Sequence, residues 1–238
     1  MSAENLLRSI SHKYLYFNRV DSYIDFPGAD RHDGQQLPKD RQGNALAKFL
    51  KARDFSAADY YDQSRGRTYA CCLSLENSDF IWSNYATDTK IGKVCVVFEF
   101  GKLRAVLNRT LQAESAAIEY NGNRCHQIFS VNYGIVEYVE WRDHQANTPY
   151  PPNPIEYIYL KDSSFSEDKE LRISLSALGI GQFVLLDGTK IDFPASLQMF
   201  FDCKAAIADG TIQRILHAPD CDSGLLCTEL HKLGIIPE

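Results

Sequence analysis

CLSLENSDFIWSNYATDTKIGKVCVVFEF, residues 72–100, carries the clearest secondary-structure signals of the chain. Its first residues complete an apolar run, residues 69–75, which predicts a buried strand. Ser78 is a residue type that caps helices, so a short helix is expected to follow it and to end before Gly92. Residues 93–100 then predict a second, central strand. A strand, a helix and another strand therefore follow one another here.

The segments on either side of this stretch add more strands than helices. Strands are expected at residues 12–17, 23–26, 127–141 (with Gly134 as a bend or hairpin), 155–160, 171–178 and 183–186, the last followed by a tight turn at 187–188. Helices are expected at residues 45–54 after Asn44, at 195–210 after Pro194, and at 225–233. Polar or proline-rich loops are expected at residues 27–43 and 143–154.

This order of elements predicts the fold class. Runs of strands with scattered helices, rather than strict strand–helix alternation, indicate a mixed α+β fold with mainly antiparallel sheets and flanking helices. The 238 residues are enough for one large domain or two small ones. Residues 143–154 are short for a linker between domains, so we expect a single domain over residues 1–238.

Composition and charge exclude several classes of protein. The formal charge of −6 argues against a general nucleic-acid-binding protein, which normally carries a basic stripe. The chain begins without a signal-peptide pattern, and no apolar stretch approaches the roughly 18 residues of a membrane span. Seven cysteines without a regular framework fit reduced thiols. We therefore expect a cytoplasmic protein with no membrane partner.

Several short motifs resemble a bacterial family, the domain of unknown function numbered twenty-nine seventy-one. The first group comprises Cys72-Leu73-Ser74, Trp82-Ser83-Asn84-Tyr85-Ala86, Gly92 and the strand at 94–99. The second group is a spaced set of one base, one aromatic residue, two acids and another base: Lys161, Phe165, Asp168, Glu170 and Arg172. One departure is that residues 28–34 stand where the family has Asn-Asp-Pro-Phe-Glu.

The second group also resembles the acidic motif of ADP-ribosyltransferases. On a strand, Asp168, Glu170 and Arg172 would point to one side, and two nearby carboxylates suit a reaction with a cationic sugar transition state. The resemblance implies an ADP-ribosyltransferase-like split sandwich. It also implies an enzyme that consumes NAD without a metal ion, as a toxin or a phage-defence effector. It makes Glu170 the catalytic carboxylate, Asp168 the acceptor-orienting acid and Arg172 a phosphate or carboxylate clamp. The cofactor pocket would be lined by Tyr14, Tyr16, Ser74 and Tyr85.

Other interpretations of the same residues stay open. The acid-rich strand is also typical of a solvated strand face with weak cross-strand ion pairs. A non-enzymatic module of a stress or defence system would use the same groove to hold a nucleotide or a partner. A metal-dependent nuclease would need a third carboxylate beside Asp168 and Glu170. A zinc site is conceivable from the ligand types His217, Cys221, Cys227 and His231, although the chain lacks a Cys-x2-Cys pair there.

Overall fold

The structure is a computed structural model that describes residues 1–26, 28–49, 52–86, 89–112, 118–120, 123–125, 128–144, 153–177, 181–184 and 188–236. Its helices flank mainly antiparallel strand pairs, so the predicted mixed α+β class is confirmed. The chain divides into two compact units, which are described separately. Unit 1 comprises Met1–Tyr16, Asn77–Glu119 and Gln198–Glu238, and unit 2 comprises Phe17–Glu76 and Tyr120–Leu197.

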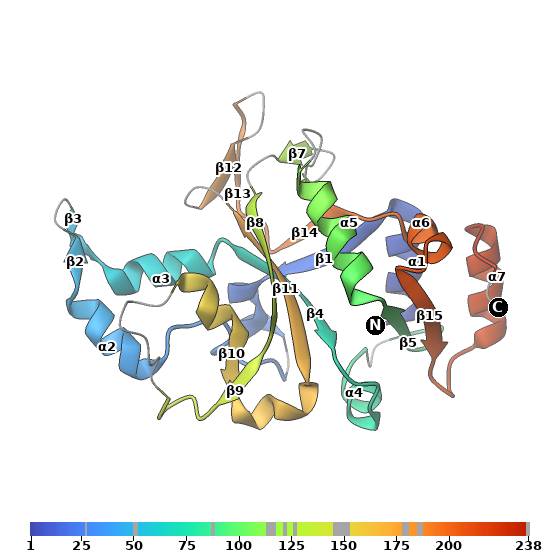
Figure 1. Cartoon of the computed structure of the whole chain (residues 1–238), viewed down its shortest axis with the longest axis horizontal. Coiled ribbons are helices and arrows are strands. Elements are labelled where there is room, and N and C mark those ends of the chain that lie inside the picture. The colour runs from blue at the N-terminus through green and yellow to red at the C-terminus, as the bar shows by residue number, and fades with distance from the viewer. Residues whose placement is uncertain are drawn as a thin grey trace. The chain divides into compact units, whose positions relative to one another are not determined.

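Unit 1 is mostly helical. Its helices are α1 (Ala3–His12), α4 (Asp79–Asn84), α5 (Phe100–Gln112), α6 (Cys203–Ala208) and α7 (Ser223–Lys232). Helix α1 contacts both α6 and α7. Strand β5 (Val94–Phe98) pairs antiparallel with β15 (Ile212–His217), and β6 (Ile118–Tyr120) pairs antiparallel with β14 (Ser196–Phe200) (Figure 1).

Unit 2 holds most of the strands. After β1 (Tyr14–Arg19), which begins in unit 1, its elements are η1 (Val20–Asp25), α2 (Pro38–Leu46), β2 (Lys48–Phe49), β3 (Ala52–Ser56), α3 (Ala57–Arg65), β4 (Thr68–Ser74), β7 (Asn123–Cys125), β8 (Ile128–Ile135), β9 (Glu137–Val139), η2 (Pro154–Tyr159), β10 (Leu160–Asp162), η3 (Ser163–Asp168), β11 (Glu170–Ala177), β12 (Gln182–Val184) and β13 (Lys190–Asp192). Here η marks a 3-10 helix.

The strands β1, β4, β11 and β8 lie side by side in that order, and each neighbouring pair is antiparallel (Figure 1). Strand β11 is therefore the inner strand between β4 and β8, and every residue of it is buried. In register, Glu170 lies opposite Ser74, and Arg172 lies opposite both Cys72 and Gly134. Because β11 is hydrogen-bonded on both edges and buried on both faces, packing fixes the positions of its side chains.

Several elements follow the sequence predictions. The expected strands at 69–75, 93–100 and 171–178 correspond to β4, β5 and β11, although β5 pairs with β15 and is not central among the described strands. Ser78 caps α4 by accepting a hydrogen bond from the backbone N–H of Ile81. Strands β12 and β13 pair antiparallel, whereas Asp187 of the expected turn lies outside the described residues. The last predicted helix is α7.

Four predicted elements are wrong. Residues 155–160 form η2, since Pro154 at its first turn and a capping box at Asn153 start a helical turn. Residues 23–26 lie largely in η1. The helix expected at 45–54 is instead the end of α2 followed by the β2–β3 hairpin.

The fourth is the helix expected at 195–210, which is β14 followed by α6. Leu197 and Met199 are buried whereas Gln198 and Phe200 are exposed, which is the two-residue period of a strand. Helix α6 begins only after Asp202, whose carboxylate accepts hydrogen bonds from two backbone N–H groups.

Gly134 lies inside β8 and is not a bend or hairpin. A Cβ atom there would lie 2.7 Å and 2.8 Å from two ring carbons of Tyr159. The Tyr159 hydroxyl is hydrogen-bonded to Ser174 Oγ at 2.8 Å, so the ring cannot move away without losing that bond. We expect Gly134→Ala to lower the free energy of unfolding by about 1–3 kcal/mol, measured by urea denaturation.

The matched control is Gly43→Ala. Gly43 lies in α2, and a Cβ there would meet nothing within 4 Å. Alanine has the higher helix propensity, so this change should be neutral or stabilise the protein by up to about 1 kcal/mol. Equal effects of the two substitutions would contradict the packing of Tyr159 against Gly134.

Candidate functional site

The most unusual feature of unit 2 is a buried cluster of five charged side chains. Its members come from the loop before α2, from β10, from the end of η3 and from β11: Asp33, Lys161, Asp168, Glu170 and Arg172. All five are buried, and Arg172 is completely inaccessible to solvent. Charged residues are almost never fully buried unless they are paired, so the pairing of each one decides what the cluster can do.

Arg172 uses every N–H of its guanidinium group. Nε and Nη2 donate to the two carboxylate oxygens of Glu170 at 2.6 Å and 3.0 Å. Nη1 and Nη2 donate to the two oxygens of Asp33 at 2.5 Å and 2.7 Å, and Nη1 also donates to the carbonyl of Ile158 at 2.7 Å. Five N–H groups with five acceptors leave no donor for a phosphate, so the clamp role expected for Arg172 has no support in this geometry.

Lys161 joins the two acids of the predicted motif. Its Nζ donates to Asp168 at 2.7 Å and to Glu170 at 3.2 Å, and it lies 4.8 Å from the centre of the Phe165 ring. Asp168 itself ends η3 and is not on the strand, because Lys169 adopts a left-handed conformation before β11 begins. The expected row of three side chains on one strand is therefore wrong for Asp168, yet its carboxylate still reaches the cluster.

Asp33 is the member that sequence analysis missed. The loop around it is held by a turn from Asp30, whose carbonyl accepts from the Asp33 N–H, and by Arg65, whose Nε donates to the Asp33 carbonyl at 2.7 Å. The only sequence signal was its position in residues 28–34, which depart from the acidic motif expected from the family resemblance. Asp33 is also a third carboxylate in the same cluster as Asp168 and Glu170, and each of the three pairs with Arg172 or Lys161.

The charges set the protonation of the cluster. Burial by itself would raise the pKa of Glu170, but Arg172 and Lys161 outweigh burial and hold that pKa at about 2. Burial would lower the pKa of Lys161, and the facing acids raise it instead. Three carboxylates face two cations, and the excess negative charge falls on the deeply buried Asp33, whose pKa is raised by burial despite Arg172. Glu170 is therefore an ionised carboxylate at neutral pH.

One partner of Glu170 is a neutral group. The thiol of Cys72, on the neighbouring strand β4, hydrogen-bonds the Glu170 carboxylate, and its Sγ lies 3.4 Å from the hydroxyl of Tyr23. Cys72 is exposed as a residue, whereas the cationic partners of Glu170 are buried, and burial of the Cys72 thiol raises its pKa and keeps it neutral. A carboxylate offers about four acceptor positions. The two cations make three hydrogen bonds to it, so the position at Cys72 is the one that a ligand can take over without breaking an ion pair.

The other predicted site residues are divided between the units. Ser74 lies opposite Glu170, but its Oγ lies 3.0 Å from the carbonyl oxygens of both Asp168 and Glu76, which share its single proton, so its hydroxyl serves the turn after β4. Tyr14, Tyr16 and Tyr85 belong to unit 1. Tyr14 is buried there, whereas Tyr16 and Tyr85 are exposed. Unit 2 thus brings together Ser74, Asp168, Glu170 and Arg172.

Two of the open interpretations are decided by these positions. The cluster is buried, so the solvated strand face is wrong. The predicted zinc ligands do not converge: within the described parts of the chain, no three His, Cys, Asp or Glu side chains form a group suited to a metal ion, and this holds for His217, Cys221, Cys227 and His231.

Across the same parts, no helix has the length and apolar character needed to cross a membrane.

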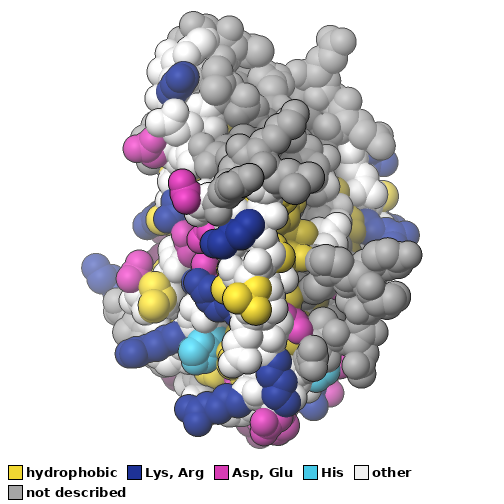
Figure 2. All heavy atoms as spheres, turned by 90° about the vertical axis from the view of Figure 1, so that its left-hand side faces the viewer, with side chains coloured by type: hydrophobic (Ala, Val, Ile, Leu, Met, Phe, Trp, Pro, Cys, Tyr) yellow, Lys and Arg dark blue, Asp and Glu magenta, His cyan; other side chains and the backbone are white. Residues whose placement is uncertain are grey.

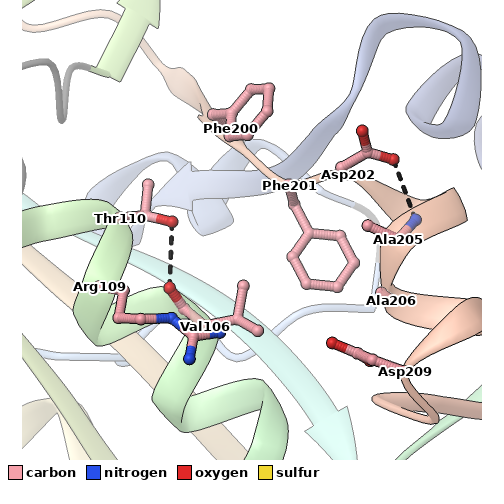
Figure 3. A pocket seen from close by; sticks show the side chains of 9 residues that line it. All are labelled: Val106, Arg109, Thr110, Phe200, Phe201, Asp202, Ala205, Ala206 and Asp209. Atoms are coloured by element: carbon pink, nitrogen blue, oxygen red, sulfur yellow. Dashed lines mark hydrogen bonds between the residues drawn. The ribbon is translucent and has the colours of Figure 1, made fainter.

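Unit 1 contains a separate small cavity of about 150 Å³ between α5, β14 and α6. The Phe201 ring points into the space between the two helices, with Arg109 and Asp209 on opposite sides of it (Figure 3). The lining residues include none of the predicted site residues. The Thr110 hydroxyl donates to the Val106 carbonyl and Asp202 caps α6, so the local polar groups at this cavity serve helix structure.

Comparison with known proteins gives neither a family nor a function for this chain. Searches with the whole chain against protein-family models, curated proteins and solved structures gave no match in any of the three.

Proposed function

We propose that this chain is an NAD-consuming enzyme of the ADP-ribosyltransferase kind, with Glu170 as its catalytic carboxylate. The observation that carries the proposal is the environment of Glu170. Two buried cations keep it ionised and fixed, and the Cys72 thiol, which belongs to an exposed residue of β4, is a neutral partner. A preorganised negative charge with one exchangeable hydrogen bond suits a substrate that develops positive charge next to a hydroxyl.

In this mechanism a ribose hydroxyl of NAD replaces the Cys72 thiol as donor to Glu170. The bond from the ribose C1′ to the nicotinamide nitrogen breaks, and nicotinamide leaves with the bonding electron pair. The carboxylate stabilises the cationic sugar until an acceptor N–H or O–H group attacks C1′ and releases a proton to solvent. Arg172 and Lys161 are positioning residues that fix Glu170, and Asp168 holds Lys161.

The proposal extends to the fold and the biological role. The antiparallel strands β1, β4, β11 and β8, with Glu170 at the start of an inner strand and Asp168 two residues before it, support an ADP-ribosyltransferase-like split sandwich. A toxin or phage-defence effector is a role in which consumption of NAD would be useful. The macromolecule or small molecule that accepts the ADP-ribose is part of what the experiment determines.

The test is release of nicotinamide from NAD by the purified chain. We expect Glu170→Gln to reduce the rate by at least about 100-fold, because the neutral amide no longer stabilises a cationic sugar. Glu167→Gln is the matched control, since Glu167 is an exposed acid three residues earlier, and it should keep the wild-type rate. Thermal unfolding of each variant confirms that it is folded.

Cys72→Ser provides a second variant that keeps a donor at Glu170 while shortening the side chain, so it should fold and stay active. Absence of nicotinamide release by the folded wild-type chain, with and without candidate acceptors, would end the enzymatic proposal.

A non-enzymatic recognition module is the second candidate, and the closure of the cluster favours it. All five donors of Arg172 are satisfied internally, and the Ser74 hydroxyl is bonded to backbone carbonyls. Such a cluster resembles a structural support beneath a binding surface. Calorimetric binding of a nucleotide without any turnover, weakened but not abolished in Glu170→Gln, would favour the module over the enzyme.

A further inference from the structure

Unit 2 carries a run of aromatic rings that begins in its core and ends at the surface. Tyr157 and Tyr61 are buried and meet edge to face at 5.4 Å. Tyr60 follows at 5.7 Å from Tyr61, and Phe49 lies 6.4 Å from Tyr60. Phe55 adds a last ring, 5.5 Å from Phe49. The inner rings anchor the outer ones, so the surface rings are held in place by packing.

The outer rings remain accessible. Phe49 is 44% exposed and Tyr60 is 38% exposed, and the neighbouring Leu46 is 85% exposed. They come from the end of α2, from β2 and from the start of α3, with β3 between the last two in the sequence. Contiguous exposed apolar side chains of this kind are typical of a binding surface.

Two basic side chains lie beside these rings, within a protein of net charge −6. Lys48 directly precedes Phe49 in β2. Arg67 lies with its Cζ 5.8 Å from the centre of the Tyr60 ring. Figure 2 faces the side of Figure 1 where α2, β2, β3 and α3 lie, and it shows Lys and Arg side chains over its middle and lower parts.

The acids of α3 are engaged within unit 2. Asp59 accepts hydrogen bonds from the backbone N–H and the hydroxyl of Ser56, at 2.7 Å and 2.6 Å. Asp62 pairs with Arg41 at 2.8 Å and accepts from Gln36 at 3.0 Å. Arg41 therefore compensates the charge of Asp62, and Ser56 holds the Asp59 carboxylate at the start of α3, while Lys48 and Arg67 flank the exposed rings.

We infer that this surface, formed by Leu46, Lys48, Phe49, Tyr60 and Arg67, binds single-stranded nucleic acid. Exposed aromatic rings stack on bases without sequence preference, and adjacent cations contact the phosphates. An apolar peptide would match the rings but not the cations around them. The surface is separate from the Glu170 cluster, so the inference does not depend on the proposed NAD chemistry.

The test is fluorescence anisotropy with a labelled oligothymidine of about twenty nucleotides, a length that spans one binding surface. We expect wild-type binding that weakens as salt is raised from about 50 to 200 mM. Phe49→Ala combined with Tyr60→Ala should weaken binding by at least about tenfold, and Lys48→Glu should weaken it and reduce its dependence on salt.

Phe26→Ala is the control, since Phe26 is a similarly exposed aromatic residue that follows η1 as its C-cap. It should bind like wild type. Circular dichroism checks that each variant is folded. No binding by wild type at low salt, or equal affinity of the double variant, would overturn the inference. Self-association of the chain that the double variant abolishes would also overturn it, because the surface would then serve a second copy.

Discussion

Replacing Arg172 with methionine is expected to lower the free energy of unfolding of unit 2 by about 3–5 kcal/mol. The substitution removes the partner that holds Glu170 and Asp33, and three buried carboxylates, those of Asp33, Asp168 and Glu170, are then left with Lys161 as the one cation of the cluster. The penalty comes from uncompensated buried charge more than from the loss of attraction. Urea denaturation measures it. A Trp82→Phe background leaves Trp141, which is buried in unit 2, as the fluorescent reporter.

Arg41→Met is the matched control for this loss of charge. Arg41 pairs with Asp62 at 2.8 Å, but both side chains are about half exposed. Exposed ion pairs contribute about 0–1 kcal/mol, so this variant should unfold almost like wild type. A cost below about 1 kcal/mol for Arg172→Met would show that the buried network is not formed as described.

Acidification is expected to remove stability that depends on Glu170. Its pKa is about 2 in the folded chain against an ordinary 4.5, so the unfolded chain binds its proton first as the pH falls. The stabilisation is therefore complete above about pH 4.5 and is lost as the pH approaches 2. Over that interval it amounts to about 3 kcal/mol.

The comparison of wild type with Glu170→Gln isolates this effect. Asp33, whose raised pKa acts in the opposite direction, and the surface carboxylates are present in both proteins. Unfolding free energies measured from pH 6 to about pH 3 should fall more steeply in wild type, because only it loses the Glu170 contribution. Parallel pH profiles would contradict the ionised, paired state of Glu170.

The sequence predicted secondary structure correctly where one local signal was enough to identify an element. The apolar run at 69–75 and the alternation in 171–178 predicted β4 and β11, and Ser78 predicted the start of α4. The sequence was misleading where apolar residues fit two periods, as in 195–210, where Leu197 and Met199 suit a helix face as well as a strand face. Only packing of β14 against its neighbours distinguishes the two.

The candidate site was predictable only in part, because the contacts of Asp33 and Cys72 join segments that are distant in the sequence. The spacing of Lys161, Asp168, Glu170 and Arg172 was visible, and these residues do converge. Asp33 pairs with Arg172 across 139 residues, and no local pattern encodes such a contact. The exchangeable partner Cys72 was noticed as a motif residue, but its contact with Glu170 follows from the register of β4 against β11.

The most direct test of the account is a crystal structure of the chain soaked with a non-cleavable analogue of NAD. The account predicts that a ribose hydroxyl of the analogue donates to Glu170 in the position now held by the Cys72 thiol, with Arg172 and Lys161 unmoved. An analogue that binds elsewhere in a fully occupied crystal, with the Cys72 thiol still on Glu170, would contradict it.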